Sequence, residues 1–259
     1  FIGEGALAAV GSSYTLMTFL TSILLGLCMG SSVYFSIQFG RQDPDKLRSG
    51  IFQAFFLIGA ITLVLNALVY ALVDPILLLL QIPPEVTGLT KTYLLWVFAG
   101  IVATFLYNFF ANLLRAVGNS VTPLLFLGIS VVLNIGLDLL FVVPLQMGVQ
   151  GAALATVMAQ TASFVVCLWY VRRHQDLFGL TRRRGGIERA KLTQMLKLGI
   201  PSAVQMTVVG LSWLAMTFLI NDYGVDASAA SGICAKIKDI ALLSTLALYT
   251  AATTVIAQC

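Results

Sequence analysis

The chain has 259 residues, of which 59% are hydrophobic and only 10% are charged, and its formal net charge at pH 7 is +4. Soluble domains carry about 25% charged residues, so this composition excludes an ordinary soluble protein and favours a chain whose main solvent is lipid. The basic residues are not interleaved with an aromatic platform, which argues against nucleic acid as a partner.

Seven apolar runs follow one another along the chain, and each is long enough to cross a bilayer core of about 30 Å as a helix. Their continuity argues against a transmembrane β-barrel, because barrel strands are about ten residues long and alternate in polarity. The sequence therefore predicts an all-α, polytopic membrane helix bundle with about seven transmembrane helices. The predicted spans are 14–37, 51–73, 91–114, 124–143, 151–171, 199–220 and 232–257.

The charges in the connections predict the orientation of these spans. Because successive helices alternate in direction, the connections 40–50, 115–123 and 172–198 lie on one side, and they hold twelve of the 15 Lys and Arg residues. The positive-inside rule makes this side cytoplasmic. We therefore expect a multi-pass protein of the cell inner (cytoplasmic) membrane, with the lipid bilayer as its surroundings.

Two features of the sequence indicate packing rather than chemistry. In the first run, Gly26 and Gly30 have the small-xxx-small spacing that lets two membrane helices approach closely. The 4 cysteines lie far apart in apolar stretches and lack metal-ligand spacing, so we expect no disulfide, no metal site and no cofactor. A nucleophile–base arrangement or a phosphate-binding loop is also missing from the sequence, so we do not expect an enzyme.

The run 124–143 contains Asp138, a carboxylate deep within an apolar segment. An ionisable group in lipid is costly and indicates a functional site. Asn134 and Ser130 precede it at intervals of four residues, so all three share one face of the predicted helix. Interhelical hydrogen bonding is the alternative interpretation, and it is favoured for Asn134 alone and for Thr156 alone. Asp138 favours a functional site, because an asparagine would make the same hydrogen bonds without a titratable group.

The next run, 151–171, begins after a short turn, so its helix is predicted to be an antiparallel neighbour. We expect Thr156 to lie at a similar depth to Asp138, because they lie about 7.5 Å and about 9 Å from the outer ends of their helices at the rise of about 1.5 Å per residue. Together Asn134, Asp138 and Thr156 form an all-oxygen set suited to a hard monovalent cation or a proton. Further polar or soft residues are candidates for lining a substrate cavity, namely Gln160, Gln205 and Met206.

Several stretches together resemble the multidrug and toxic compound extrusion (MATE) family, from its second to its eighth helix. The stretch with the most specific pattern runs from Leu114 to Pro123 and reads LRAVGNSVTP. The others are LAAVG at 7–11, QFG at 38–40, NIGLD at 134–138, GVQGAALAT at 148–156 and GIP at 199–201.

The resemblance implies a twelve-helix antiporter whose two lobes rock around a central cavity and export small, drug-like, cationic compounds in exchange for H+ or Na+. It implies an N-terminal lobe at 1–173, a basic inter-lobe loop at 174–198 and the start of a C-terminal lobe at 199–259. The positions of Asn134, Asp138 and Thr156 match the family's N-lobe cation site. An aspartate on a first helix, expected in a missing remainder of the chain, completes that site in the family, and we expect a monomer.

Two other functions fit parts of the pattern. A flippase of lipid-linked precursors shares this architecture, but a pyrophosphate-bearing cargo needs intramembrane Arg or Lys residues, of which the chain has few. A seven-helix receptor fits the helix count, while a weak repeat between the first and last runs argues against it.

Overall fold

The computed structural model describes residues 4–79, 84–173, 189–221, 234, 241–242, 245 and 247–259, and the regular structure of these residues is helical. Residues 247–258 form helix beyond the labelled elements. The labelled elements are α1 (Glu4–Gly40), α2 (Pro44–Leu79), α3 (Pro84–Ala99), α4 (Ile101–Ala116), α5 (Val121–Val142), α6 (Gly148–Arg173) and α8 (Arg189–Asn221).

Apolar composition and length make most of these helices suitable for crossing a bilayer. Within the described residues, 5 helices meet this condition, or 6 if the bent pair of α3 and α4 forms one span. The seventh predicted run, 232–257, lies partly outside the described residues, and its described end, 247–257, is helical. The lipid-facing character is clearest on α5, where Val132 is 73% exposed and its neighbours on that face are also apolar. The predicted all-α membrane bundle is thus confirmed.

Two boundaries differ from the predicted ones. The run 91–114 is not one straight helix, because α3 and α4 meet at Gly100 with a bend of 45°. The predicted inter-lobe loop 174–198 is too long, because α8 already begins at Arg189. Packing stabilises the first turns of α8 as helix, because Met195, which is only 1% exposed, lies close to Gly50 of α2 and Tyr34 of α1.

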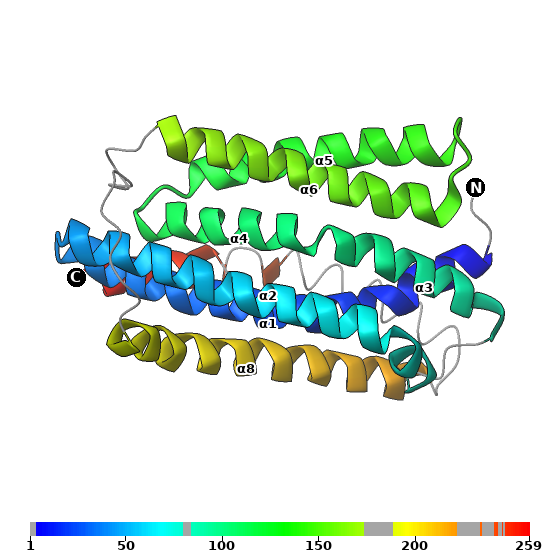
Figure 1. Cartoon of the computed structure of the whole chain (residues 1–259), viewed down its shortest axis with the longest axis horizontal. Coiled ribbons are helices and arrows are strands. Elements are labelled where there is room, and N and C mark those ends of the chain that lie inside the picture. The colour runs from blue at the N-terminus through cyan, green and yellow to red at the C-terminus, as the bar shows by residue number, and fades with distance from the viewer. Residues whose placement is uncertain are drawn as a thin grey trace.

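The long helices run side by side along the longest axis of the molecule (Figure 1). α1 packs against α2, α3, α4 and α8, while α6 packs against α3, α4 and α5. The core between them contains edge-to-face aromatic pairs, such as Phe109 of α4 with Phe35 of α1 at 6.0 Å between ring centroids. This packing places α6 between α5 and the bent α3–α4 pair.

The predicted cytoplasmic connections gather at one end of the bundle. The α1–α2 turn, the α4–α5 turn, the end of α6 and the start of α8 all lie at the left of Figure 1, whereas the α5–α6 turn lies at the right. The helices therefore alternate in direction as the charge pattern requires. Most of the described Lys and Arg residues therefore lie near one end of the molecule.

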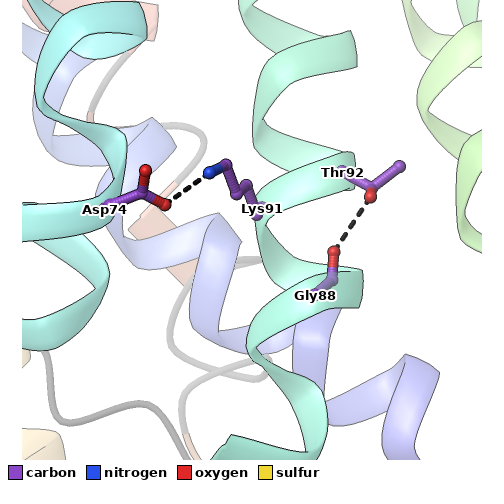
Figure 2. A network of polar contacts seen from close by, with 4 residues as sticks. All are labelled: Asp74, Gly88, Lys91 and Thr92. Atoms are coloured by element: carbon purple, nitrogen blue, oxygen red, sulfur yellow. Dashed lines mark hydrogen bonds and ion pairs between the residues drawn. The ribbon is translucent and has the colours of Figure 1, made fainter.

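An ion pair joins α2 to α3 at the opposite end. The Lys91 ammonium group lies 2.5 Å from the Asp74 carboxylate (Figure 2). The hydroxyl of the next residue, Thr92, donates to the carbonyl of Gly88, one turn earlier on α3. The side chain of Asp74 is 70% exposed and that of Lys91 is 38% exposed. An exposed pair of this kind contributes only about 0–1 kcal/mol.

Candidate functional site

Two hydroxyl groups hold α5 against α6 and set their register. Ser130 donates to the carbonyl of Ala159 at 3.0 Å, and Ser163 donates to the carbonyl of Phe126 at 3.1 Å. All four residues are buried. Because the two bonds run in opposite senses between antiparallel helices, they fix which residues of α5 and α6 lie at the same level.

Asn134 and Asp138 continue the face of α5 that Ser130 presents to α6, since each follows at an interval of four residues. Both side chains are half-buried. Asn134 Nδ2 and Asp138 Oδ1 are nevertheless inaccessible to solvent and find no hydrogen-bond partner among the described residues. A buried acceptor without a donor is costly. The carboxylate oxygen of Asp138 is therefore suited to a proton or a bound cation.

Thr156 does not lie at the depth expected for it. Asp138 lies four residues before the end of α5, or about 6 Å, whereas Thr156 lies eight residues after the start of α6, or about 12 Å. The register set by the two serines places Thr156 level with Leu133 and Asn134, and Asp138 level with Gly151. The expectation of equal depth was wrong by about one turn.

The difference arises at the connection between the two helices. This tight turn includes Gln146 and Gly148, both of which have positive φ, and α6 begins at Gly148 rather than at Gly151. The structure thus brings Asn134 and Thr156 to one level, with Asp138 one turn nearer the connecting turn. The Thr156 hydroxyl donates to the carbonyl of Ala152 at 3.0 Å, which leaves its oxygen free to accept.

Tyr93 of α3 joins this region, although sequence reasoning did not single it out. Its side chain is 8% exposed and packs in a small cluster with Val149 and Ala153 of α6. Val149 and Ala153 lie on either side of Gly151, which is level with Asp138, so Tyr93 packs on α6 at the level of Asp138. The sequence signal was weak, because tyrosines in membrane helices are commonly interfacial anchors. Only the packing of α3 on α6 distinguishes Tyr93 from such an anchor.

A cavity of about 180 Å³ opens between α1, α3, α4 and α6. Apolar side chains form most of its wall, and the described residues that line it include no Asp, Glu, Lys or Arg. An apolar cavity of about 150 Å³ is large enough to hold benzene. This cavity therefore has room for one ring-sized group. Its polar lining consists of Thr21, Thr104, Asn108, Thr156 and Gln160.

Hydrogen bonds organise the polar side of the cavity. The Thr104 hydroxyl contacts the Gln160 carboxamide oxygen across the α4–α6 interface. The Asn108 carboxamide donates to the carbonyl of Thr104 at 2.8 Å. Gln160 was a predicted cavity residue, and the structure places it on the wall of this cavity. Thr156 connects the two regions, because it lines the cavity and lies level with Asn134.

The other two predicted cavity residues lie elsewhere. Gln205 is exposed and Met206 is half-buried, and both lie on α8, which does not line this cavity. Their role stays a prediction. Within the described residues no group of three or more His, Cys, Asp or Glu side chains is arranged to hold a metal ion.

Comparison with known families gives a match to the MatE family model over residues 1–140. The chain is 33% identical to "Probable multidrug resistance protein YpnP" of Bacillus subtilis, over 99% of this chain and 57% of that protein. It is 28% identical to "Multidrug export protein MepA" of Staphylococcus aureus, over 85% of this chain and 49% of that protein. The chain thus spans about half the length of the curated relatives it matches.

Solved structures share the fold. One is an outward-facing multidrug resistance MATE family transporter of the MOP superfamily, with a TM-score of 0.86 and 20% identity, over 99% of this chain and 57% of that one. Another is the Vibrio cholerae MATE transporter VcmN in its bent form, with a TM-score of 0.87 and 24% identity, over 99% of this chain and 58% of that one. At these identities the likeness supports the fold alone.

Proposed function

We propose, since this chain belongs to the MatE family, that the full-length protein is a secondary active antiporter. It exports small organic, cationic compounds across the inner membrane in exchange for H+ or Na+, and it acts as a monomer. The names of the relatives YpnP and MepA support multidrug export as the general activity. The cargo and the coupling ion are proposals drawn from the site.

The observation that carries the proposal is the position of Asp138. Its Oδ1 atom is buried on a membrane-spanning helix and has no hydrogen-bond partner among the described residues. A carboxylate in such a place is unfavourable unless a proton or a cation neutralises it. Uptake and release of that cation during the transport cycle would link the ion gradient to export.

The cargo site in this proposal is the cavity beside Thr156 and Gln160. Its lining combines apolar walls with uncharged hydroxyl and carboxamide groups. Such a surface accepts an aromatic ring with a few hydrogen-bonding groups, and the positive charge of a cationic cargo would remain outside the described cavity. The N-terminal lobe (1–173) would hold both sites, and α8 would begin the second lobe.

The test replaces Asp138 by Asn in the full-length protein and measures efflux of ethidium, a fluorescent organic cation, from energised cells. Asn keeps the size of the side chain but cannot exchange a proton or carry the charge, so gradient-driven efflux should be abolished. Asp74→Asn is the matched control, because it makes the same chemical change at an exposed ion pair and should leave efflux unchanged. Membrane insertion of both variants is checked by immunoblotting of membrane fractions. Normal efflux by Asp138→Asn would refute the proposal.

A further inference from the structure

We infer that Gly100 and Val157 form a joint that transmits cation occupancy at Asp138 to the cavity lined by Thr104 and Gln160. This inference rests on the proposed function. Gly100 and Val157 lie in the wall of this cavity but offer no polar side chain to either ligand, so in this account they are positioning residues. Their role is to control how α3, the arm before the bend, moves relative to α4, the arm after it.

The joint lies in the middle of a regular seam. α3 and α4 run alongside α6 in the same direction, and contacts recur along them at intervals of three or four residues, which is the spacing of one helix face. The contacts join Tyr93 and Val97 to Val149 and Ala153, Gly100 to Val157, and Thr104 to Gln160. The bend therefore occurs where the seam passes from the region near Asp138 to the cavity.

Hydrogen bonds make the bend a defined turn rather than a frayed end. The N–H of Gly100 donates to the carbonyl of Val97 at 3.0 Å, which tightens the last turn of α3. The carbonyl of Gly100 accepts from the N–H of Thr104 at 3.1 Å and from the Thr104 hydroxyl at 3.3 Å. Thr104 thus links the turn at Gly100 directly to Gln160.

Close contact with α6 explains why the joint requires glycine. A Cβ atom at position 100 would lie 2.5 Å from Cγ2 and 2.9 Å from Cγ1 of Val157. These distances are far shorter than van der Waals contact, so the valine methyl groups occupy the space that a side chain would need. The bent helix pair therefore contacts α6 at Val157, and α3 and α4 can pivot about this contact.

Around the bend the two arms share the cavity wall, because Val97 and Phe98 of α3 also line the cavity, but farther from the bend they differ. On the α3 arm, Tyr93 packs against Val149 and Ala153 of α6, on either side of the level that Asp138 occupies. On the α4 arm, Thr104 and Asn108 line the cavity. When a cation neutralises Asp138, the α5–α6 packing at its level changes, and α3 shifts because Tyr93 packs on α6 there. Because α3 pivots on Val157, the shift alters the cavity wall on the far side of Gly100.

The experiment measures the coupling between the two ligands in the purified full-length protein in nanodiscs. Ethidium affinity is determined by fluorescence anisotropy with and without Na+ at fixed pH, and again across a pH step at fixed Na+. In the wild type, the coupling cation should change the affinity by a factor of about 5–150, the usual range for coupled sites. If Gly100 had only a structural role, its substitution would change the ethidium affinity with and without the cation by the same factor, and the ratio of the two affinities would stay the same.

Three variants test the joint. Gly100→Ala adds a Cβ atom that collides with Val157, and Val157→Ala removes the contact at the bend. Each should bring the coupling ratio, which is the ethidium affinity with the cation divided by that without it, close to one while ethidium still binds. The double variant Gly100→Ala/Val157→Ala places the new methyl group in the vacated space and should restore the ratio. Gly128→Ala is the control, because a Cβ atom there meets nothing within 4 Å. Its ratio should equal that of the wild type.

Two results would overturn the joint alone, namely wild-type coupling in both single variants or no restoration in the double variant. A wild-type protein whose ethidium affinity ignores both Na+ and pH would overturn the proposed function together with this inference. Asp138→Asn separates these cases, because under the proposed function it removes the cation effect whatever the state of the joint.

Discussion

At the scale of single residues, the polar groups of this bundle divide into two kinds. Most hydroxyl groups return to their own helix, as Thr62 does by donating to the carbonyl of Ile58 at 2.8 Å. Ser130 and Ser163 instead donate to carbonyls of the neighbouring helix. The interhelical pair holds α5 on α6 and thereby positions Asn134 and Asp138. The hydroxyl groups that bond to a neighbouring helix therefore support the candidate site.

Removal of these interhelical bonds should loosen the α5–α6 pair. Each of Ser130→Ala and Ser163→Ala should lower the free energy of unfolding by about 0.6–1.7 kcal/mol, the range for hydrogen bonds between membrane helices. Thr161→Ala is the control, because the exposed Thr161 hydroxyl bonds only to Val157 of its own helix in the structure. Thermal unfolding in one detergent provides the measurement. Equal stability of all three variants would show that the two serines do not hold the pair.

Much of the candidate site was predictable at this scale, because it follows from helical periodicity. The face shared by Ser130, Asn134 and Asp138 needed only the repeat of a helix. The relative depth of Thr156 was not predictable, because it depends on where the turn ends and α6 begins. Tyr93 was missed because its proximity to Asp138 arises from the packing of a third helix.

At the scale of helices, α1 and α8 meet through small residues on both partners. A Cβ atom on Gly26 would collide with the backbone of Ala203, and one on Gly30 would collide with the backbone of Gly199. The spacing of four residues on each helix places both contacts on one face. The predicted close approach at Gly26 and Gly30 is confirmed, and its partner is α8.

A methyl group in this contact should force the two helices apart. Gly30→Ala should destabilise the protein by about 1–3 kcal/mol, the usual cost of overpacking, because the atoms it meets belong to the backbone and cannot rotate away. Gly59→Ala is the matched control, since its Cβ atom would lie 3.5 Å from the ring of Phe105 in ordinary contact. Apparent melting temperatures compare the two. A stable Gly30→Ala variant would argue against the close contact.

Sequence patterns predicted the helices better than their breaks. Apolar length alone indicated the spans, because lipid requires every backbone group to be bonded within its helix. The bend at Gly100 could not be read from an apolar run, since it depends on the contact with Val157. The early start of α8 depends likewise on the burial of Met195 against another part of the chain.

At the scale of the whole molecule, charge and topology agree. Most of the described Lys and Arg residues lie near the end of the bundle that holds the α1–α2 turn, the α4–α5 turn, the end of α6 and the start of α8 (Figure 1). Arg173 at this end lies over the ring of Trp169 at 5.5 Å, an arrangement suited to the membrane interface. The opposite end carries the exposed Asp74–Lys91 pair. This asymmetry predicts which end faces the cytoplasm.

Thiol labelling of intact cells tests that orientation. In the full-length protein with Cys234 and Cys259 changed to Ser, Gln146→Cys should react with a membrane-impermeant maleimide, because it lies in the exposed α5–α6 turn. Gln42→Cys, in the exposed α1–α2 turn, should react only after the cells are opened. The reverse pattern of labelling would invert the topology.

The most direct test of cation coupling through Asp138 is transport in proteoliposomes that contain the full-length protein. An imposed Na+ or H+ gradient should drive ethidium against its own concentration gradient in the wild type. Asp138→Asn should fail to concentrate ethidium under either gradient, while still exchanging it passively across the bilayer. Concentration of ethidium by Asp138→Asn to the wild-type level would contradict the account.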